Sequence, residues 1–300
     1  MKNKIILFIY FLLHITGELY AQAPRIANPG NAVPESDVYL VQAIFRNGSI
    51  AFGGVKNITE RPGYDNQPSF DINGNLLYVS IREDKQAEIY KYDMEKKFIS
   101  KFTVSKTSEY SPRQCPDGKF ISHVTVEKDS TQRIWKTDIA TGLFQKILTE
   151  KSDSIGYYTW LNDSTIAFAK ITKPMSLWST NIKSGKETFL ASDIGRSMSV
   201  SVEGLLYYTH MIENKRWLMR VEEDGKHQPL IEFQDGASED FCFAPGNIIL
   251  NAKNGMLYFT DHDFSKGWKA TADWERAGIK NIQRLALSPD GKWLALVVMK

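Results

Sequence analysis

The sequence predicts an all-β protein, a six-bladed β-propeller built from four-stranded antiparallel blades. Tight turns recur roughly every 40–46 residues, the period of a four-stranded propeller blade. The turns are Asn73-Gly74, Asp117-Gly118, Asp163-Ser164, Glu203-Gly204, Gly246-Asn247 and Asp290-Gly291. Other strands carry an apolar–aromatic pair: Val38-Tyr39, Ile89-Tyr90, Ile134-Trp135, Leu177-Trp178, Trp217-Leu218 and Leu257-Tyr258. The first pair precedes the first turn and none follows the last turn. We therefore expect N-terminal outer strands to pair with C-terminal inner strands and close the ring.

The N-terminal residues have the pattern of an export signal. Lys2 and Lys4 precede an apolar run over 5–16, and Ala21 and Ala23 are small residues suited to cleavage after either one. The run is too short to span a hydrocarbon core of about 30 Å, which argues against a retained membrane anchor. We expect a signal peptide over 1–21, a linker over 22–36 and a propeller over 37–300. After cleavage the protein is expected in the periplasm without a membrane anchor, with secretion as the alternative.

The expected strands follow from local signals along the chain. Residues 38–45 and 49–55 are the outer strands of the closing blade, joined at Asn47-Gly48, because both turn residues tolerate a positive φ. The end of the fifth blade, 269–278, is expected to include a short helical turn. The second blade shows the full cycle, with strands over 111–115, 120–126, 132–139 and 143–148.

Charge and cysteine content limit the possible partners and cross-links. The formal net charge is +2, or about +1 without residues 1–21. Nucleic-acid binding needs a cluster of excess basic residues, so we expect no nucleic-acid partner. We also expect the protein to be a monomer. Cys115 and Cys242 fall in innermost strands of blades that face each other across the channel. A disulfide needs Cα atoms roughly 5.5 Å apart, so two free thiols are predicted.

Several segments resemble the TolB-type propeller repeat, in which an inner strand ends in Ser-Pro-Asp-Gly. Residues 68–74, 116–118 and 285–291 carry this signal, and residues 88–93 and 133–138 fit its third-strand pattern Ile-Tyr-x-x-Asp. Residues 62–70 are similar to a form common in exported TolB-like proteins of the Bacteroidetes. The resemblance covers roughly residues 37–300. It implies a propeller that lacks the N-terminal domain of TolB, and it implies little about activity.

The sequence contains no common catalytic or metal-binding motif. Gly-x-Ser-x-Gly, His-Glu-x-x-His, Cys-x-x-Cys and a Walker-type loop are all absent. His123 and His210 are expected to make structural hydrogen bonds, and Asp261-His262-Asp263 is expected to be a solvated turn. We therefore predict no catalytic residue, no metal ligand and no cofactor, with Ca²⁺ as the alternative.

The loops that lead into the innermost strands are expected to gather at one mouth of the channel and form a concave site. Their side chains could bind a peptide end or a small polar ligand, or they could satisfy one another and ordered water. Clustered carboxylates can also hold Ca²⁺, although nearby arginines oppose it. The candidate ligand-binding residues are Tyr64, Asp65, Asn66, Glu109, Tyr110, Tyr157, Tyr158, Arg196, Glu239, Asp240 and Arg284.

We expect an exported, non-enzymatic propeller that binds a protein, peptide or small polar ligand at the channel mouth, with its partner in the cell envelope. The alternative is a metal-dependent hydrolase related to lactonases, with Asp65 and Glu109 near the metal. A sugar-binding accessory protein is a third possibility, which no residue distinguishes from the first.

Overall fold

The computed structural model describes residues 33–46, 49–148 and 152–300. Residues 34–300 form one compact unit. The expected signal peptide over 1–21, residues 22–32 of the expected linker and the Asn47-Gly48 turn lie outside the described residues. In the described part of the chain the regular elements are strands and two short 3₁₀ helices, η1 (Phe264–Lys266) and η2 (Glu275–Ala277).

Four separate sheets contain four antiparallel strands each, and each sheet follows the order of the chain. The first two sheets are formed by β7 (Ser108–Gln114), β8 (Phe120–Val126), β9 (Gln132–Asp138) and β10 (Phe144–Lys146), and by β11 (Ile155–Asn162), β12 (Thr165–Lys170), β13 (Ser176–Asn181) and β14 (Glu187–Ser192). The other two are formed by β15 (Ile194–Val200), β16 (Leu206–Ile212), β17 (Lys215–Val221) and β18 (His227–Glu232), and by β19 (Ala237–Ala244), β20 (Ile248–Lys253), β21 (Met256–Thr260) and β22 (Lys269–Asp273).

The remaining strands form one eight-stranded sheet. Its halves are joined because Ser36 pairs in parallel with Tyr64 and the Ser36 backbone N–H donates to the Gly63 carbonyl at 3.0 Å. The prediction of six four-stranded blades is therefore wrong: the all-β propeller has four separate blades and one larger sheet. The strands of that sheet are β1 (Ser36–Arg46), β2 (Ser49–Asn57), β3 (Tyr64–Phe70), β4 (Leu76–Ile81), β5 (Ala87–Asp93), β6 (Phe98–Lys101), β23 (Ile282–Leu287) and β24 (Trp293–Met299).

The expected pairing between the two ends of the ring is present. β1 pairs antiparallel with β24, from Ser36 opposite Met299 to Gln42 opposite Trp293. Beside this pairing, Lys300 Nζ lies 2.8 Å from Asp37 Oδ1. The edges that β1 and β24 would otherwise expose are thus covered, which removes a site for aggregation.

The tight turns join the first and second strands of each hairpin, as predicted. Between β3 and β4, the Asp71 carboxylate accepts backbone hydrogen bonds from Asn73 at 2.9 Å and Asn75 at 2.8 Å. Gly74 follows with φ +79°, a left-handed conformation that costs glycine no steric strain. Short-range turn chemistry therefore determines where these hairpins form.

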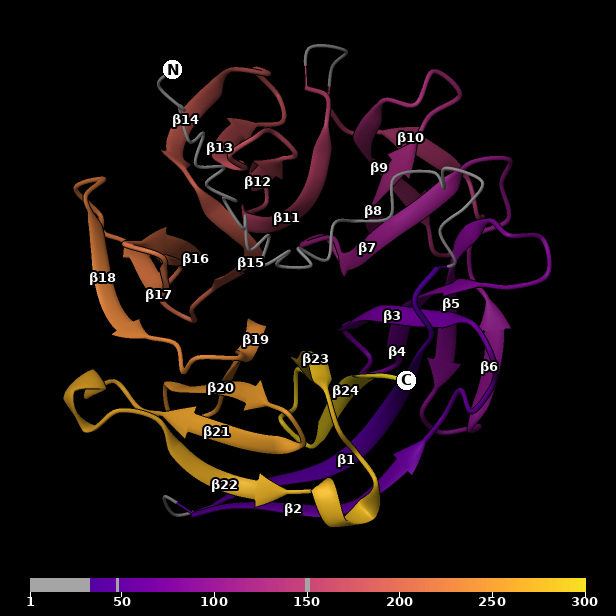
Figure 1. Ribbon diagram of the computed structural model, residues 1–300. Helices are drawn as coiled ribbons and strands as arrows, with labels where there is room; N and C mark the ends of the chain where they lie inside the picture. The colour runs from indigo at the N-terminus through magenta and orange to yellow at the C-terminus, as the bar shows by residue number, and fades with distance from the viewer. Residues whose placement is uncertain (1–32, 47–48, 149–151) are drawn as a thin grey trace, which may run out of the picture. The chain divides into compact units, whose positions relative to one another are not determined.

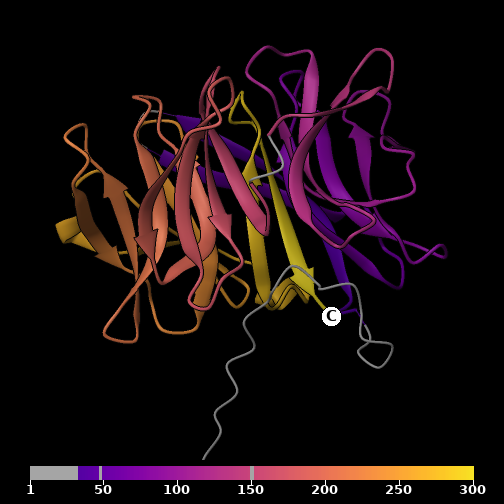
Figure 2. The same ribbon diagram turned by 90° about the horizontal axis from the view of Figure 1, so that it is seen from above.

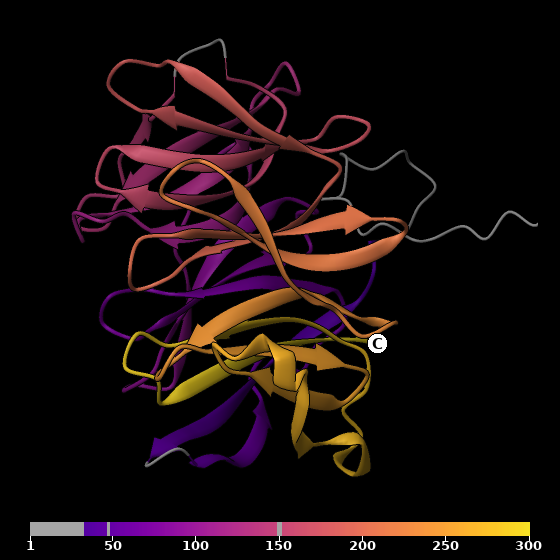
Figure 3. The same ribbon diagram turned by 90° about the vertical axis from the view of Figure 1, so that its left-hand side faces the viewer.

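The sheets of the 34–300 unit lie around a common centre (Figure 1). In that view β3, β7, β11, β15, β19 and β23 lie nearest the centre, and β6, β14, β18, β22 and β2 lie toward the outside. Figure 2 and Figure 3 show the same unit turned by 90°, with the sheets side by side. The innermost strands are thus the elements that can line a central cavity.

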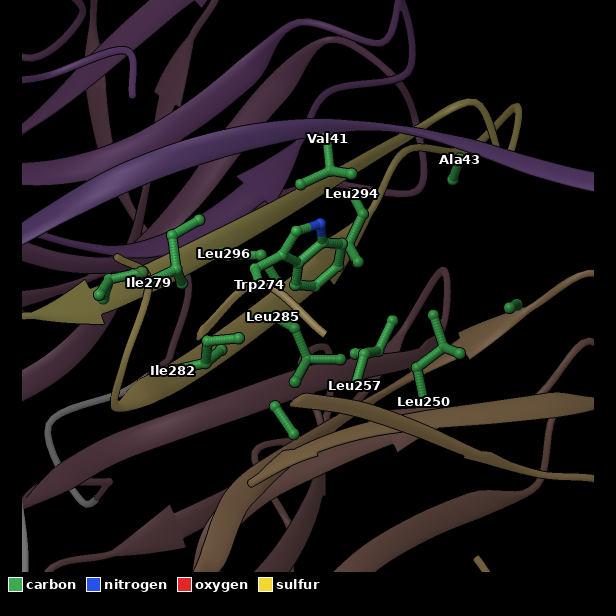
Figure 4. Close-up of a cluster of buried hydrophobic side chains, with 13 residues drawn as sticks. Val41, Ala43, Leu250, Leu257, Trp274, Ile279, Ile282, Leu285, Leu294 and Leu296 are labelled. Atoms are coloured by element: carbon green, nitrogen blue, oxygen red, sulfur yellow. The ribbon is translucent and has the colours of Figure 1, made fainter. Parts of the chain in front are cut away.

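Apolar side chains fill the spaces between neighbouring sheets. One such cluster lies between the sheet β19–β22 and the strands β1, β23 and β24 (Figure 4). Trp274 lies in the middle of this cluster, and its ring makes an edge contact with Phe52 at a centroid distance of 5.7 Å. The expected helical turn over 269–278 is only partly correct, because Lys269–Asp273 is strand β22 and only Glu275–Ala277 is helical.

None of the helices in the described residues combines the length and apolar character that crossing a membrane requires.

Candidate functional site

A cavity of about 390 Å³ lies at the centre of the unit and is lined by residues of β3, β7, β11, β15, β19 and β23. The lining extends along these innermost strands toward their C-terminal ends, where the hairpin turns to the next strand of each sheet begin. There it includes Pro289, an exposed residue of the turn between β23 and β24. The volume lies within the range of small-molecule sites, about 300–1,000 Å³.

The eleven candidate residues divide into two groups. Tyr157, Tyr158, Arg196, Asp240 and Arg284 line the cavity. The other candidates lie on the same innermost strands but not in the lining: Tyr64, Asp65, Asn66, Glu109, Tyr110 and Glu239. The structure therefore brings together part of the expected constellation, and the cavity lies further along the strands than the expected mouth.

Irregular pairing explains the difference. The expected loops are strand residues, and the register shifts between Asn66 and Ser69 in β3 and between Tyr110 and Arg113 in β7. Such bulges bend a strand and change the direction of its side chains. Within the two bulges, Gln67 and Ser111 adopt left-handed backbone conformations with φ of 54° and 53°. Residues before the bulges are thus directed differently from residues after them.

Asp65 and Glu109 are fully buried carboxylates outside the cavity. Asp65 Oδ1 accepts a hydrogen bond from Arg61 at 2.9 Å, and Glu109 Oε1 accepts hydrogen bonds from Ser105 at 2.6 Å and Thr107 at 2.8 Å. Burial raises the pKa of both carboxyl groups, although these donors oppose the shift. Their contacts are those of groups that tie loops to the innermost strands.

Tyr64, Asn66 and Tyr110 are buried residues outside the cavity lining. Asn66 Nδ2 donates to Gln283 Oε1 at 3.3 Å, which links β3 to β23. Gln67 Nε2 donates to the Tyr64 hydroxyl at 3.4 Å. Burial raises the pKa of Tyr64, and it raises that of Tyr110 to about 12. These tyrosines are therefore neutral at physiological pH.

An ion-pair network connects three neighbouring innermost strands, β15, β19 and β23, along the cavity wall. Arg196 Nε donates to Asp240 Oδ1 at 2.8 Å, and Arg284 lies 3.3 Å from Asp240 Oδ2. Arg196 also approaches Glu239, whose Oε2 is 3.6 Å from the guanidinium. Burial alone would raise the pKa of Asp240, but Arg196 and Arg284 outweigh it and lower that pKa. Asp240 is thus a stable carboxylate that holds two guanidinium groups in place.

Gly195 allows the close approach on which this network depends. The backbone N–H of Arg196 donates to Glu239 Oε1 at 2.5 Å. A Cβ atom at Gly195 would collide with Glu239 Oε1 and with the Thr209 hydroxyl. A glycine is therefore required here for lack of space between β15 and β19.

Arg113 is the charged cavity residue that is absent from the sequence-predicted candidates. It lies after the bulge in β7, lines the cavity and is partly buried. No carboxylate oxygen among the described residues lies within 4.0 Å of its guanidinium, since Asp240 pairs with Arg196 and Arg284 instead. The register shift between Tyr110 and Arg113 breaks the alternation of side chains along β7, so alternation in the sequence does not place Arg113 on the inner face.

Two polar atoms beside this network are buried without hydrogen-bond partners in the described residues. They are the Tyr157 hydroxyl and Arg284 Nε. The Arg284 guanidinium lies 5.6 Å from the centroid of the Tyr157 ring. Both side chains are more than nine-tenths buried and line the cavity. Unpaired buried polar atoms are uncommon in native proteins and call for a structural or functional reason.

The histidines outside the cavity differ in their contacts. His123 is fully buried, with Nδ1 3.0 Å from the Thr125 hydroxyl and Nε2 2.8 Å from the Thr137 hydroxyl. Burial lowers its pKa to about 3. This confirms the structural role predicted for His123. The predicted hydrogen bond of His210 is not shown, because its Nδ1 is buried without a partner in the described part of the chain.

The remaining sequence predictions concern thiols and a turn. Cys115 and Cys242 are both free, as predicted. Cys242 lines the cavity from β19, whereas Cys115 directly follows β7. The Asp263 backbone N–H donates to Asp261 Oδ1 at 2.9 Å, which is typical of a polar turn. Within residues 33–46, 49–148 and 152–300, no cluster of three or more His, Cys, Asp or Glu side chains could hold a metal ion.

No family model matches the chain, and no curated protein matches it. Among solved structures it is similar to a protein of Agrobacterium tumefaciens provisionally named TolB, with TM-score 0.66 and 14% identity over 90% of this chain and 99% of that chain. TolB from Acinetobacter baumannii matches with TM-score 0.50 and 20% identity over 63% of this chain and 51% of that chain. A gluconolactonase from Xanthomonas campestris matches with TM-score 0.63 and 11% identity over 90% and 98% of the two chains.

These similarities show the fold. The chain is a β-propeller, and its structural neighbours include TolB-like proteins and gluconolactonases. At such low identities a shared fold does not transfer a function, because propellers carry different sites on similar frameworks.

Proposed function

We propose that this protein is an exported, non-enzymatic β-propeller of the cell envelope that binds a protein, peptide or small polar ligand in its central cavity. The cavity of about 390 Å³, lined by arginine, tyrosine and tryptophan side chains, is the observation that supports the proposal. Export is supported by Lys2, Lys4 and the apolar run over 5–16, and by the resemblance of residues 62–70 to exported TolB-like proteins of the Bacteroidetes.

The charged groups of the cavity suit a binding role. Arginine remains protonated at all physiological pH values and therefore holds a ligand rather than exchanging protons with it. Asp240 is held ionised by Arg196 and Arg284, so its proton affinity is low. Because these side chains are already held in place, binding a polar ligand costs little side-chain conformational entropy.

Site-specific photo-cross-linking tests this proposal. A benzophenone amino acid replaces Trp160, which lines the cavity, or Phe189 on the outer strand β14, which is 52% exposed. After irradiation in an envelope extract of the source organism, the Trp160 position should give a defined product that the Phe189 position does not. Absence of a product at Trp160, or the same products at both positions, would contradict binding in the cavity.

A further inference from the structure

The cavity has an excess of positive charge. Its charged lining consists of three arginines, Arg113, Arg196 and Arg284, and one carboxylate, Asp240. Glu239 approaches Arg196 from outside the lining. Even when Glu239 is included, three guanidinium groups face two carboxylates, which favours an anionic occupant.

Among the three arginines of the cavity lining, Arg113 is the one without a carboxylate partner in the described residues. Asp240 pairs with Arg196 and Arg284 at 2.8 and 3.3 Å, so both of its oxygens are already engaged. Burial lowers the pKa of Arg113, with Tyr158 and Asp240 opposing and Arg284 adding to the shift. A lowered pKa means that the surroundings stabilise the charged form less than water does.

Donor groups with unmet hydrogen-bonding capacity lie in the same region. Arg284 Nε and the Tyr157 hydroxyl are buried in the cavity wall and have no hydrogen-bond partner in the described residues. Guanidinium and hydroxyl groups donate to oxygen acceptors, and guanidinium groups bind carboxylate and phosphate oxygens in pairs.

We propose that the central cavity binds an oxyanion, a carboxylate or phosphate group of the ligand, and that Arg113 is its principal contact. This inference rests on the proposed binding function and names the chemical class of its ligand. The oxyanion supplies the charge that Arg113 lacks, while Asp240 keeps Arg196 and Arg284 in place beside it. The group can belong to a peptide carboxyl terminus, a small organic acid or a phosphate compound, which share this chemistry.

The unliganded protein offers an independent check. Arg113 forms no ion pair within the described residues that its replacement would break, so Arg113→Gln should be at least as stable as the natural protein in the absence of ligand. A residue that has only a structural role would instead lower stability when it is replaced. Thermal unfolding followed by circular dichroism measures this difference, and a clear loss of stability would count against the proposal.

Isothermal titration calorimetry tests the ligand class. The probes are a tripeptide with a free carboxyl terminus, succinate and inorganic phosphate, and the neutral controls are the same tripeptide amidated at its carboxyl terminus and succinamide. At least one anionic probe should bind at least about 10-fold more tightly than its neutral control, and Arg113→Gln should weaken that binding by about 10-fold or more. Arg113→Lys, which retains the charge, should recover part of the affinity.

The matched control is Arg276→Gln, because Arg276 is exposed on η2. It should bind the anionic probe as the natural protein does. The preferred probe identifies the source of the oxyanion. If none of the three anions binds, or if Arg113→Gln binds them unchanged, the oxyanion inference is wrong even where cross-linking at Trp160 succeeds. If anions bind through Arg113 and cross-linking fails, the proposed envelope ligand is wrong while the oxyanion site remains.

Discussion

Replacing Gly195 by alanine should destabilise the protein through the Arg196–Glu239 contact. The new Cβ would collide with Glu239 Oε1 and Thr209 Oγ1 and would lie 2.9 Å from Glu239 Cδ. Glu239 is held because it accepts a hydrogen bond from the Arg196 backbone at 2.5 Å. Relief requires either strain of about 1–3 kcal/mol or loss of a charge-assisted hydrogen bond worth about 1.5–3 kcal/mol. We expect Gly195→Ala to lower the free energy of unfolding by about 3 kcal/mol.

Urea denaturation followed by circular dichroism measures this change. Gly54→Ala is the control, because no atom lies within 4 Å of a Cβ at that position and its φ is not left-handed. The double variant Gly195→Ala/Glu239→Ala should lose less stability than the sum of its single variants, since removing Glu239 relieves much of the collision. A Gly195→Ala variant within about 0.5 kcal/mol of the natural protein would refute this reasoning.

Three further predictions concern His123, the Trp274 core and the two cysteines. The pKa of His123 is about 3 in the folded protein and near 6.5 in the unfolded chain. The contribution of His123 to stability should therefore be complete above about pH 6.5 and should be lost as the pH falls toward 3. His123→Gln should flatten that part of the curve of unfolding free energy against pH, and an unchanged slope would contradict the buried neutral state. Trp274→Ala should cost about 3–5 kcal/mol in urea denaturation, whereas Phe98→Ala, at a side chain that is 63% exposed, should stay within about 0.5 kcal/mol. Ellman's reagent should titrate two thiols, Cys115 and Cys242, in the unfolded chain without reductant, and a result of none would show a disulfide.

The strands and turns were predictable because their signals are local. The Asn73-Gly74 pair predicted a turn, and the structure has a hairpin there, in which the Asp71 side chain accepts a backbone hydrogen bond and Gly74 is left-handed. The offset between turns and aromatic strands also predicted that β1 and β24 would pair. The eight-stranded sheet was not predictable, because its two halves join through a single pair, Ser36 and Tyr64, which has no pattern of its own.

The site was predictable only in part, because its position depends on irregular pairing. The repeat pattern indicates which strands are innermost, and Arg196, Asp240 and Arg284 were therefore predictable. The start of each strand was expected to form the mouth, whereas bulges direct Asp65 and Glu109 into buried contacts away from the cavity. Arg113 was missed for the same reason. Alternation along the strand predicts which side chains share a face, but a bulge changes the count by an amount that the sequence does not reveal.

The most direct test of the binding site is a crystal structure of the protein grown with the anionic probe that binds most tightly. We expect the probe in the central cavity, with its oxygen atoms at about 2.7–2.9 Å from the Arg113 guanidinium, while Asp240 still pairs with Arg196 and Arg284. A probe bound elsewhere on the propeller, or a cavity in which Arg113 makes no contact with it, would contradict the oxyanion site.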